Sequence, residues 1–240
     1  TNEQCLFIAH GIGANGKSVF LNLIKKLMGD YAMTTPMASL VSLKTNSGAS
    51  NDIARLRGAR FVSASEGEAN QKLKVALIKQ LTGGDTITAR HLFHEFFEFI
   101  PHFSMWIATN FKPKVSGDDL AIWRRINLIP FYVSIPPDEQ DKNLSQKLEN
   151  EMPGILNWAL QGSKDWYRDG LMPPSEVLLA TEKYRTEMDG FSRFLEEGII
   201  TKRLEAQTSK AELYNVYSQW CTDEGVEMLT KMELGTRMKQ

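Results

Sequence analysis

Cysteine and long apolar runs are both scarce in this chain of 240 residues. Its two cysteines, Cys5 and Cys221, lie far apart and lack metal-ligand spacing, which argues against a disulfide framework or a thiolate metal site. No apolar run approaches the roughly 20 residues that span a bilayer, and no secretory signal opens the chain. We therefore expect a protein of a reducing, cytoplasmic setting with no membrane partner.

Internal repeats and low-complexity tracts are also absent from the sequence. With 42% hydrophobic and 24% charged residues, the composition is that of a globular protein with one large core and room for a small appended unit. The chain begins at Thr1, without an initiator Met, and stops at Gln240 where another element begins. We expect it to be a fragment of a longer protein.

Charge is distributed unevenly although the net charge is only −1. Residues 1–135 carry 15 Lys and Arg against 10 Asp and Glu, whereas residues 136–240 carry 13 against 19. Ordinary surface variation explains this equally well. The basic half also holds the phosphate-binding motif described next, so a polyanion is a candidate partner there.

A complete phosphate-binding pattern, G-x-x-x-x-G-K-[ST], occupies residues 11–18. An apolar run at 5–9 predicts the strand before it, and residues 19–24 predict the helix after it, which is the context such a loop needs. We predict that Lys17 reaches the β- and γ-phosphates of a nucleoside triphosphate and that the Ser18 hydroxyl binds Mg²⁺. The alternative is a Gly-rich turn that binds nothing. The predicted nucleotide-binding residues are Gly11, Gly13, Ala14, Asn15, Gly16, Lys17, Ser18 and Val19.

Strands alternate with helices through the first part of the chain, and several of the strands are apolar throughout. This pattern predicts an α/β fold with a central, mainly parallel sheet. Beyond Pro136-Pro137 the spacing becomes helical, and the last stretch holds a helix whose aromatic face we expect in a core. The expected strands are 4–10, 31–35, 60–65, 104–109 and 126–133; the expected helices are 16–28, 69–82, 118–125, 139–151, 153–168 and 175–188, with a loop at 44–51, a hairpin at 86–100 and a core face of Leu213, Val216, Tyr217 and Trp220.

Polar side chains follow two of the predicted strands. Glu66 comes directly after the strand at 60–65, with Glu68 two residues on, and Asn110 follows the strand at 104–109. A carboxylate at such a strand end would hold Mg²⁺ or polarise the attacking water, and the amide would orient that water. The alternatives are acids that favour a helix dipole and an Asn that caps a turn.

Two further groups of basic residues are candidates. Arg124 and Arg125 precede an apolar strand, and an arginine of this kind can stabilise the transferring phosphoryl group, often from a neighbouring subunit, although paired arginines are commonly surface charge. In the predicted hairpin, Arg90 and His91 lie among phenylalanines and are candidates for nucleic-acid contact. Core packing explains most of those phenylalanines equally well, and we assign no metal role to His91 or His94.

The order of these signals resembles the superfamily 3 helicases, and most closely the helicase part of phage- and plasmid-type primases and the poxvirus primase-helicase. The matching segments are GIGANGKS, SASEGE, LIKQLTGGDTITAR, MWIATNFKP and IWRRINLIPF, in that order, over roughly residues 4–131. The stretch from SRFLEE to ELYNVYSQWC resembles the small winged-helix region that follows in this family.

The resemblance implies an AAA+ type P-loop ATPase core at 1–135, a helical region at 136–190 and a truncated winged-helix-like unit at 191–240. It implies a replicative, 3′ to 5′ DNA helicase that forms a hexameric ring, hydrolyses ATP with Mg²⁺ at subunit interfaces and translocates on single-stranded DNA. A primase domain is expected on the same full-length chain, in a bacterial or phage-infected cytoplasm.

Residue by residue, the resemblance makes Gly16, Lys17 and Ser18 the first motif, and Glu66 the acid of the second motif. Asn110 becomes the polar sensor, and Arg124 or Arg125 the arginine finger. Many members carry two adjacent acids where this chain has Glu66 and Glu68 separated by a glycine, so the residue that activates water stays open between them. Two other functions stay open: a P-loop kinase of a small molecule, and a DNA-binding module that ATP switches without turnover.

Overall fold

The structure, a computed structural model, describes residues 3–42, 49–65, 68–115, 119–197, 199–200, 207–226 and 228–238. Contacts between residues divide the chain into two units, the first ending at Glu182 and the second beginning at Lys183. The helical residues up to Glu182 therefore belong to the same unit as the sheet. The functional division into residues 1–135, 136–190 and 191–240 stays a prediction.

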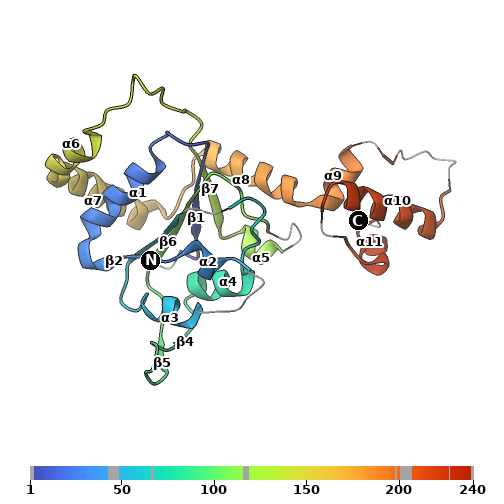
Figure 1. The fold of residues 1–240 in the computed structure, drawn as a ribbon, viewed down its shortest axis with the longest axis horizontal. Coiled ribbons are helices and arrows are strands. Elements are labelled where there is room, and N and C mark those ends of the chain that lie inside the picture. The colour runs from blue at the N-terminus through green and yellow to red at the C-terminus, as the bar shows by residue number, and fades with distance from the viewer. Residues whose placement is uncertain are drawn as a thin grey trace. The chain divides into compact units, whose positions relative to one another are not determined.

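A parallel sheet of five strands forms the centre of the first unit (Figure 1). Its order is β2-β3-β6-β1-β7, so β1 lies between β6 and β7, with Leu6 opposite both Met105 and Ile126. The predicted α/β fold with a mainly parallel sheet is confirmed. The strands are β1 (Leu6–His10), β2 (Ala32–Thr34), β3 (Phe61–Ser65), β6 (Ser104–Thr109) and β7 (Ile126–Pro130).

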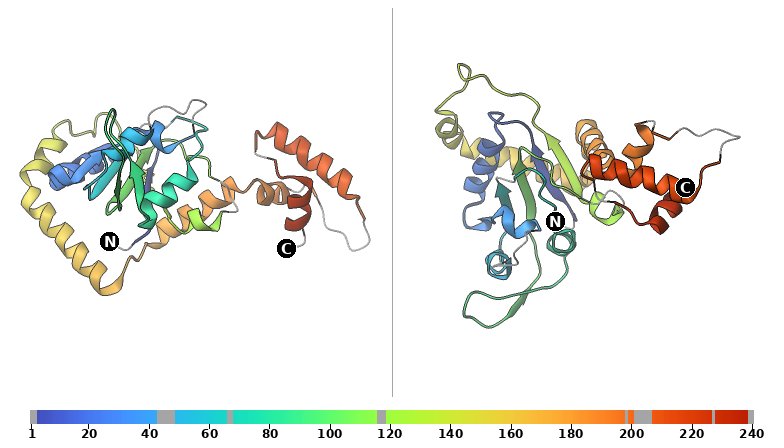
Figure 2. Two further views of the ribbon diagram at one scale, coloured as in Figure 1. Left: turned by 90° about the horizontal axis from the view of Figure 1, so that it is seen from below. Right: turned by 45° about the vertical axis from the view of Figure 1, so that its right-hand side comes forward.

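Helices cover both faces of this sheet, α1 on one side and α4 on the other (Figures 1 and 2). Trp106 of β6 packs under α1, with its ring stacked 4.6 Å from that of Phe7 and tilted 5.7 Å from that of Phe20. Burial of such large rings contributes a substantial part of the apolar stabilisation of the core. The elements here are α1 (Lys17–Met28), the 3₁₀ turn η1 (Gly29–Tyr31), α2 (Met37–Leu40), α3 (Ala49–Ala54), α4 (Val75–Gly83) and α5 (Leu120–Trp123).

The elements predicted at 69–82 and 44–51 differ from the structure. The helix expected at 69–82 begins only at Val75, because Leu73 donates its N–H to the carbonyl of Lys114 and bridges Val41. These long-range backbone bonds hold the segment before Val75 extended. In the expected loop at 44–51, residues 43–48 lie outside the described part of the chain, and α3 begins at Ala49.

The predicted hairpin is confirmed as β4 (Ile87–Ala89) paired antiparallel with β5 (Phe97–Phe99). It projects from the sheet and its helices (Figures 1 and 2). Gly84 ends α4 in the left-handed conformation, so that only three residues separate α4 from β4. The hairpin is thus attached closely to α4.

Three helices follow β7: α6 (Leu144–Asn150), α7 (Met152–Asp169) and α8 (Ser175–Met188). They agree with the predicted helices except that α6 begins five residues after Glu139. Within the described ranges, none of the helices combines the length and apolar character that crossing a bilayer would require.

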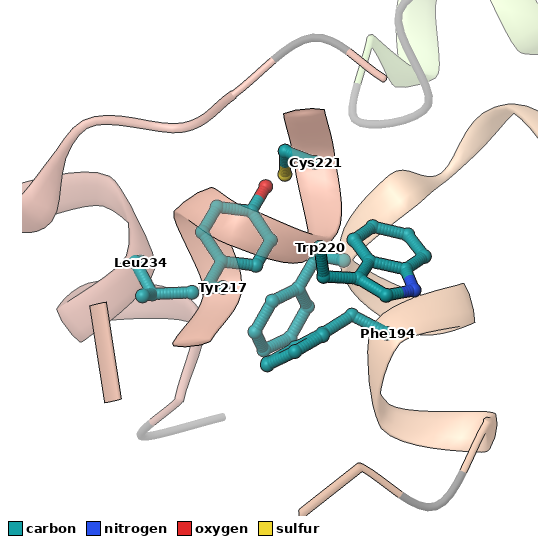
Figure 3. Close-up of a cluster of buried hydrophobic side chains, with 6 residues drawn as sticks. Phe194, Tyr217, Trp220, Cys221 and Leu234 are labelled. Carbon is teal, nitrogen blue, oxygen red and sulfur yellow. The ribbon is translucent and has the colours of Figure 1, made fainter. Parts of the chain in front are cut away.

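The second unit is built around an aromatic cluster of α9 (Gly190–Glu196), α10 (Lys210–Asp223) and α11 (Lys231–Arg237) (Figure 3). Phe194 meets Tyr217 edge-to-face at 5.1 Å and lies 5.4 Å from Trp220. The expected core role of Tyr217 and Trp220 is confirmed, whereas Val216 is 41% exposed. Residues 183–197, 199–200, 207–226 and 228–238 contain no strand, so a winged helix stays a prediction.

A partly buried ion pair holds α11 to α9. Both oxygens of Asp189 accept hydrogen bonds from Arg237, at 2.8 and 2.7 Å, and the same carboxylate caps α9. Burial opposes the charge of Asp189, but the bonds from Arg237 and Ser192 outweigh it and lower the pKa of this carboxyl. The stabilisation is therefore present above about pH 4 and is lost as the pH falls through the lowered folded-state pKa.

We predict that Asp189→Asn lowers the free energy of unfolding of the second unit by about 1–3 kcal/mol at pH 7, because it leaves Arg237 without its counter-charge. Hydrogen exchange of the α9–α11 amides measures the effect. The difference from the native chain should be constant from pH 7 to about 5 and should shrink below about pH 4. Asp223→Asn, an exposed position in α10, is the control. An equal loss in both variants would contradict the role of this ion pair.

Candidate functional site

The predicted phosphate-binding loop, residues 11–18, connects the carboxyl end of β1 to the amino end of α1, as expected. Gly13, Ala14 and Gly16 have positive φ angles of 31°, 47° and 84°. Gly16 precedes the first residue of α1, so the loop turns back over the start of that helix. Free N–H groups at a helix N-terminus and the helix dipole both favour an anion at this place.

The segment after β7 lies against this loop, whereas the sequence predicted that the strand at 126–133 continues through residues 131–133. Residues 131–135, here named the strap, follow β7 and bond the loop backbone at both ends: Phe131 donates its N–H to the carbonyl of His10 at 2.7 Å, and Ile135 donates to that of Ala14 at 2.8 Å. The side-chain amide of Asn15 donates to the carbonyl of Phe131 at 3.2 Å. The strap therefore holds the loop in shape, and Asn15 joins the two.

Gly11 lies where the strap and the loop come closest. A Cβ atom at Gly11 would lie 2.2 Å from the carbonyl oxygen of Phe131 and 2.5 Å from the side-chain nitrogen of Asn15. The Gly11 N–H donates to the carbonyl of Thr109 on the other side. Space between two backbones, rather than a positive φ angle, is what requires glycine here.

Lys17 is the cation of this site. Its side chain is only 6% exposed, and the ammonium donates to the carbonyl of Gly11 at 2.5 Å and to Asn15 Oδ1 at 2.9 Å. Burial lowers the pKa of Lys17 from its usual value. The two acceptors aim the ammonium back over the loop, where phosphate oxygens would lie.

A cavity of about 400 Å³ opens beside the loop, lined by residues 13–19 together with Ser65, Ala108, Thr109 and Asn110. The end of β3 and the end of β6 thus meet the loop at one edge of the sheet, because parallel strands end there together. Asn110 lies in this cavity as expected. Lys17 and Ser18 face the same space and supply the ammonium and hydroxyl that a triphosphate and its Mg²⁺ require.

The two candidate acids are placed differently. Glu66, the predicted Mg²⁺ ligand, lies outside the described residues, one position after Ser65 of the cavity lining. Glu68 is exposed, its backbone N–H donates to the side-chain oxygen of Gln71, and it does not line the cavity. Across the described ranges, no three His, Cys, Asp or Glu side chains gather as a metal cluster.

The neighbouring arginines have opposite surroundings. Arg124 is exposed, whereas Arg125 is 7% exposed and donates to the carbonyl of Ala121 at 2.5 Å and to Gln4 Oε1 at 2.9 Å. Burial, with repulsion from Arg124, lowers the pKa of Arg125. Both residues precede β7, while the loop follows β1, its parallel neighbour. They are thus separated from the cavity by a five-residue strand, roughly 16 Å.

The tip of the hairpin presents basic and aromatic side chains to solvent. The Arg90 guanidinium lies 4.9 Å from the ring centre of Phe96, and the His91 ring stacks on Phe97 at 5.4 Å. Phe93 is 97% exposed and Phe96 is 62% exposed, so core packing does not account for these two phenylalanines. Phe99 is buried, as a core residue would be.

The amino-acid sequence is similar to viral proteins that are named putative helicases or putative primases. A protein named "Putative helicase" of Acanthamoeba polyphaga mimivirus is 28% identical over 238 residues, covering 91% of this chain and 25% of the relative. Another of that name from Frog virus 3 is 27% identical over 234 residues, covering 88% and 23%. A "Putative primase" of African swine fever virus is 22% identical over 238 residues, covering 91% and 25%. The resemblance to primase-helicases is confirmed.

The chain spans about a quarter of the length of the curated relatives it matches. A family model described as "Family of unknown function (DUF5906)" matches residues 9–125, from the end of β1 to Arg125.

A solved structure shares the fold. The apo structure of the NrS-1 C-terminal region aligns with a TM-score of 0.56 at 14% identity, covering 84% of this chain and 52% of that one.

We predict that Gly11→Ala displaces the strap, because the added methyl group would overlap the backbone of Phe131. The cost should be about 1–3 kcal/mol of stability, with loss of hydrogen-exchange protection at the amides of Phe131 and Ile135. Gly154→Ala, which meets open space in α7, is the matched control and should leave both amides protected. Unchanged protection in Gly11→Ala would contradict the close approach.

Proposed function

We propose that this chain is the ATPase core of a DNA helicase, of the AAA+ type, and that it hydrolyses ATP with Mg²⁺. The observation that carries the proposal is the cavity that joins the phosphate-binding loop to Ser65 and Asn110 at one edge of the sheet. Because β6 separates β1 from β3, the amide of Asn110 lies between the loop and the strand end that precedes Glu66. The names of the viral relatives support a helicase or primase role.

In this proposal the loop N–H groups and Lys17 hold the phosphates, and the Ser18 hydroxyl and Glu66 hold the metal ion. Mg²⁺ neutralises phosphate charge when it is bound with ATP. Glu66 or Glu68 polarises the attacking water, and Asn110 orients it. We favour Glu66, because it follows Ser65 of the cavity lining directly whereas Glu68 is exposed away from that lining.

We assign the arginine finger to Arg124 and a structural role to Arg125. The buried guanidinium of Arg125 is bonded within its own subunit, while that of Arg124 is exposed and roughly a strand length from its own loop. Only a second copy could bring Arg124 to the phosphates, as a closed ring of subunits would. A hexamer that moves 3′ to 5′ along single-stranded DNA is the assembly implied by the resemblance.

The hairpin is the proposed DNA contact. Arg90 would pair with phosphates, and the exposed Phe93 ring would stack on a base. Its position between β3 and β6 in the chain links it to both strand ends of the ATP site.

We predict that the protein hydrolyses ATP, that single-stranded DNA stimulates the rate, and that Lys17→Ala lowers the rate at least about a hundredfold. Arg124→Ala should be equally inactive, yet a mixture of Arg124→Ala with Lys17→Ala subunits should regain activity, because some interfaces pair an intact loop with an intact arginine. Turnover assays on purified variants and their mixtures measure this.

Arg125→Ala is the matched control. It should lower the melting temperature. A mixture of Arg125→Ala with Lys17→Ala subunits should regain only as much activity as the folded fraction of the Arg125→Ala subunits allows. Recovery in the Arg125→Ala mixture alone would reverse the assignment. Full activity in Lys17→Ala would refute the proposed site, phosphate release that depends on a small metabolite would favour a kinase, and ATP binding without turnover would favour a switch.

We predict that Arg90→Ala with His91→Ala weakens single-stranded DNA binding and lowers its salt slope by about 1, because a phosphate contact is lost. Phe93→Ala should weaken binding by about 1–3 kcal/mol without changing the slope, because stacking is not ionic. Fluorescence anisotropy over a range of salt concentrations separates the two effects. Arg168→Ala, an exposed position in α7, is the control. Native affinity in all these variants would remove the hairpin from the DNA site.

A further inference from the structure

Helix α4, which leads into the hairpin, is joined by an ion pair to the N-cap of helix α5, whose C-cap is Arg124. The Lys79 ammonium on α4 donates to both oxygens of Asp119, at 2.6 and 2.9 Å. Asp119 is also the N-cap of α5, where it accepts the N–H groups of Ala121 and Ile122. One carboxylate therefore sets the start of α5 and attaches that helix to α4.

A second connection lies at the other end of the two helices. The side chain of Gln4 donates to the carbonyl of Gly83, the last residue of α4, and accepts from Arg125. A Cβ at Gly83 would lie 3.8 Å from Arg125 Nη2 and 3.2 Å from the carboxylate of Asp85. The end of α4 thus lies directly against Arg125, the residue that follows Arg124.

These contacts give the hairpin and the exposed arginine one common support. Only three residues separate α4 from β4, and Arg124 is the C-cap of α5. Both side chains of the ion pair are about a third exposed or less, at 32% for Lys79 and 27% for Asp119, so solvent screens the pair only partly. A displacement of the hairpin can therefore be transmitted to Arg124 through a continuous series of bonded residues.

We propose that Lys79, Asp119 and Arg125 are positioning residues that couple DNA at the hairpin to the placement of Arg124 in a neighbouring subunit's ATP site. The inference rests on the proposed function, since it takes both the hairpin contact and the arginine from there. DNA bound to one subunit would then raise hydrolysis in the adjacent one. Reciprocity holds for the binding part of this coupling: if DNA changes the ATP affinity of the adjacent site, ATP bound there changes the DNA affinity by the same factor.

The test compares Lys79→Gln, Asp119→Asn and the double variant. Asn at 119 retains an acceptor for the α5 N–H groups while it removes the charge. The ratio of the ATPase rate with saturating single-stranded DNA to the rate without it should fall at least about threefold in each variant. The double variant should fall no further than the single ones, because the two residues act as one pair. Lys79→Arg, which keeps the charge, should retain the native ratio.

Asp141→Asn and Lys147→Gln are matched controls, since they remove a surface ion pair of 2.7 Å at the start of α6. They should leave the ratio unchanged. A native ratio in Lys79→Gln and Asp119→Asn, or additive losses in the double variant, would overturn the coupling. The coupling would also be overturned if the basal ATPase rate or the DNA affinity of these variants fell as much as the DNA-stimulated rate, because that result would show a structural effect alone.

The DNA stimulation of the native protein distinguishes a failure of the coupling from a failure of the proposed function. If DNA does not stimulate its ATPase at all, the helicase proposal fails first. If the native protein is stimulated and the variants retain that stimulation, only the coupling fails.

Discussion

The hydrogen bonding of β1 to a parallel strand on each side is the constraint on which the rest of this site depends. β6 and β7 fix the point where β1 ends, and the loop that follows is then bonded on both flanks. Gly11 donates to Thr109 beyond β6, while His10 and Ala14 accept from the strap beyond β7. Moving β1 by one residue would break both sets of bonds and turn the side chains of β1 to the opposite faces of the sheet, since the side-chain period of a strand is two.

The same sheet also separates the two halves of the proposed chemistry. Its carboxyl edge gathers the loop, Ser65 and Asn110, whereas Arg124 lies at the amino end of β7. Because parallel strands all run one way, a residue that precedes a strand cannot reach the cavity at its far end. A site divided in this manner favours a second copy as the source of the arginine, which is the physical content of the proposed ring.

Much of the fold was predictable because its signals are local. The phosphate-binding loop, the buried strands and α8 follow from apolar patterning and from glycine spacing within a few residues. The helix expected at 69–82 was predicted too long because nothing near Leu73 reveals that its N–H bonds Lys114. The exposure of Phe93 was likewise invisible, since an aromatic residue in an apolar run usually belongs to a core.

The sequence by itself determined that a glycine-rich loop with the pattern G-x-x-x-x-G-K-[ST] joins a buried strand to a helix, because that motif is defined by adjacent residues and their backbone freedom. Only the tertiary structure decided which of the two arginines is available to a partner. Arg124 and Arg125 are neighbours of identical chemistry, and they differ solely in what packs around them. Gln4 and Ala121 bind the second guanidinium, and nothing buries the first. The strap shows the same limit, because its bonds to the loop join residues more than a hundred positions apart, and no local pattern records them.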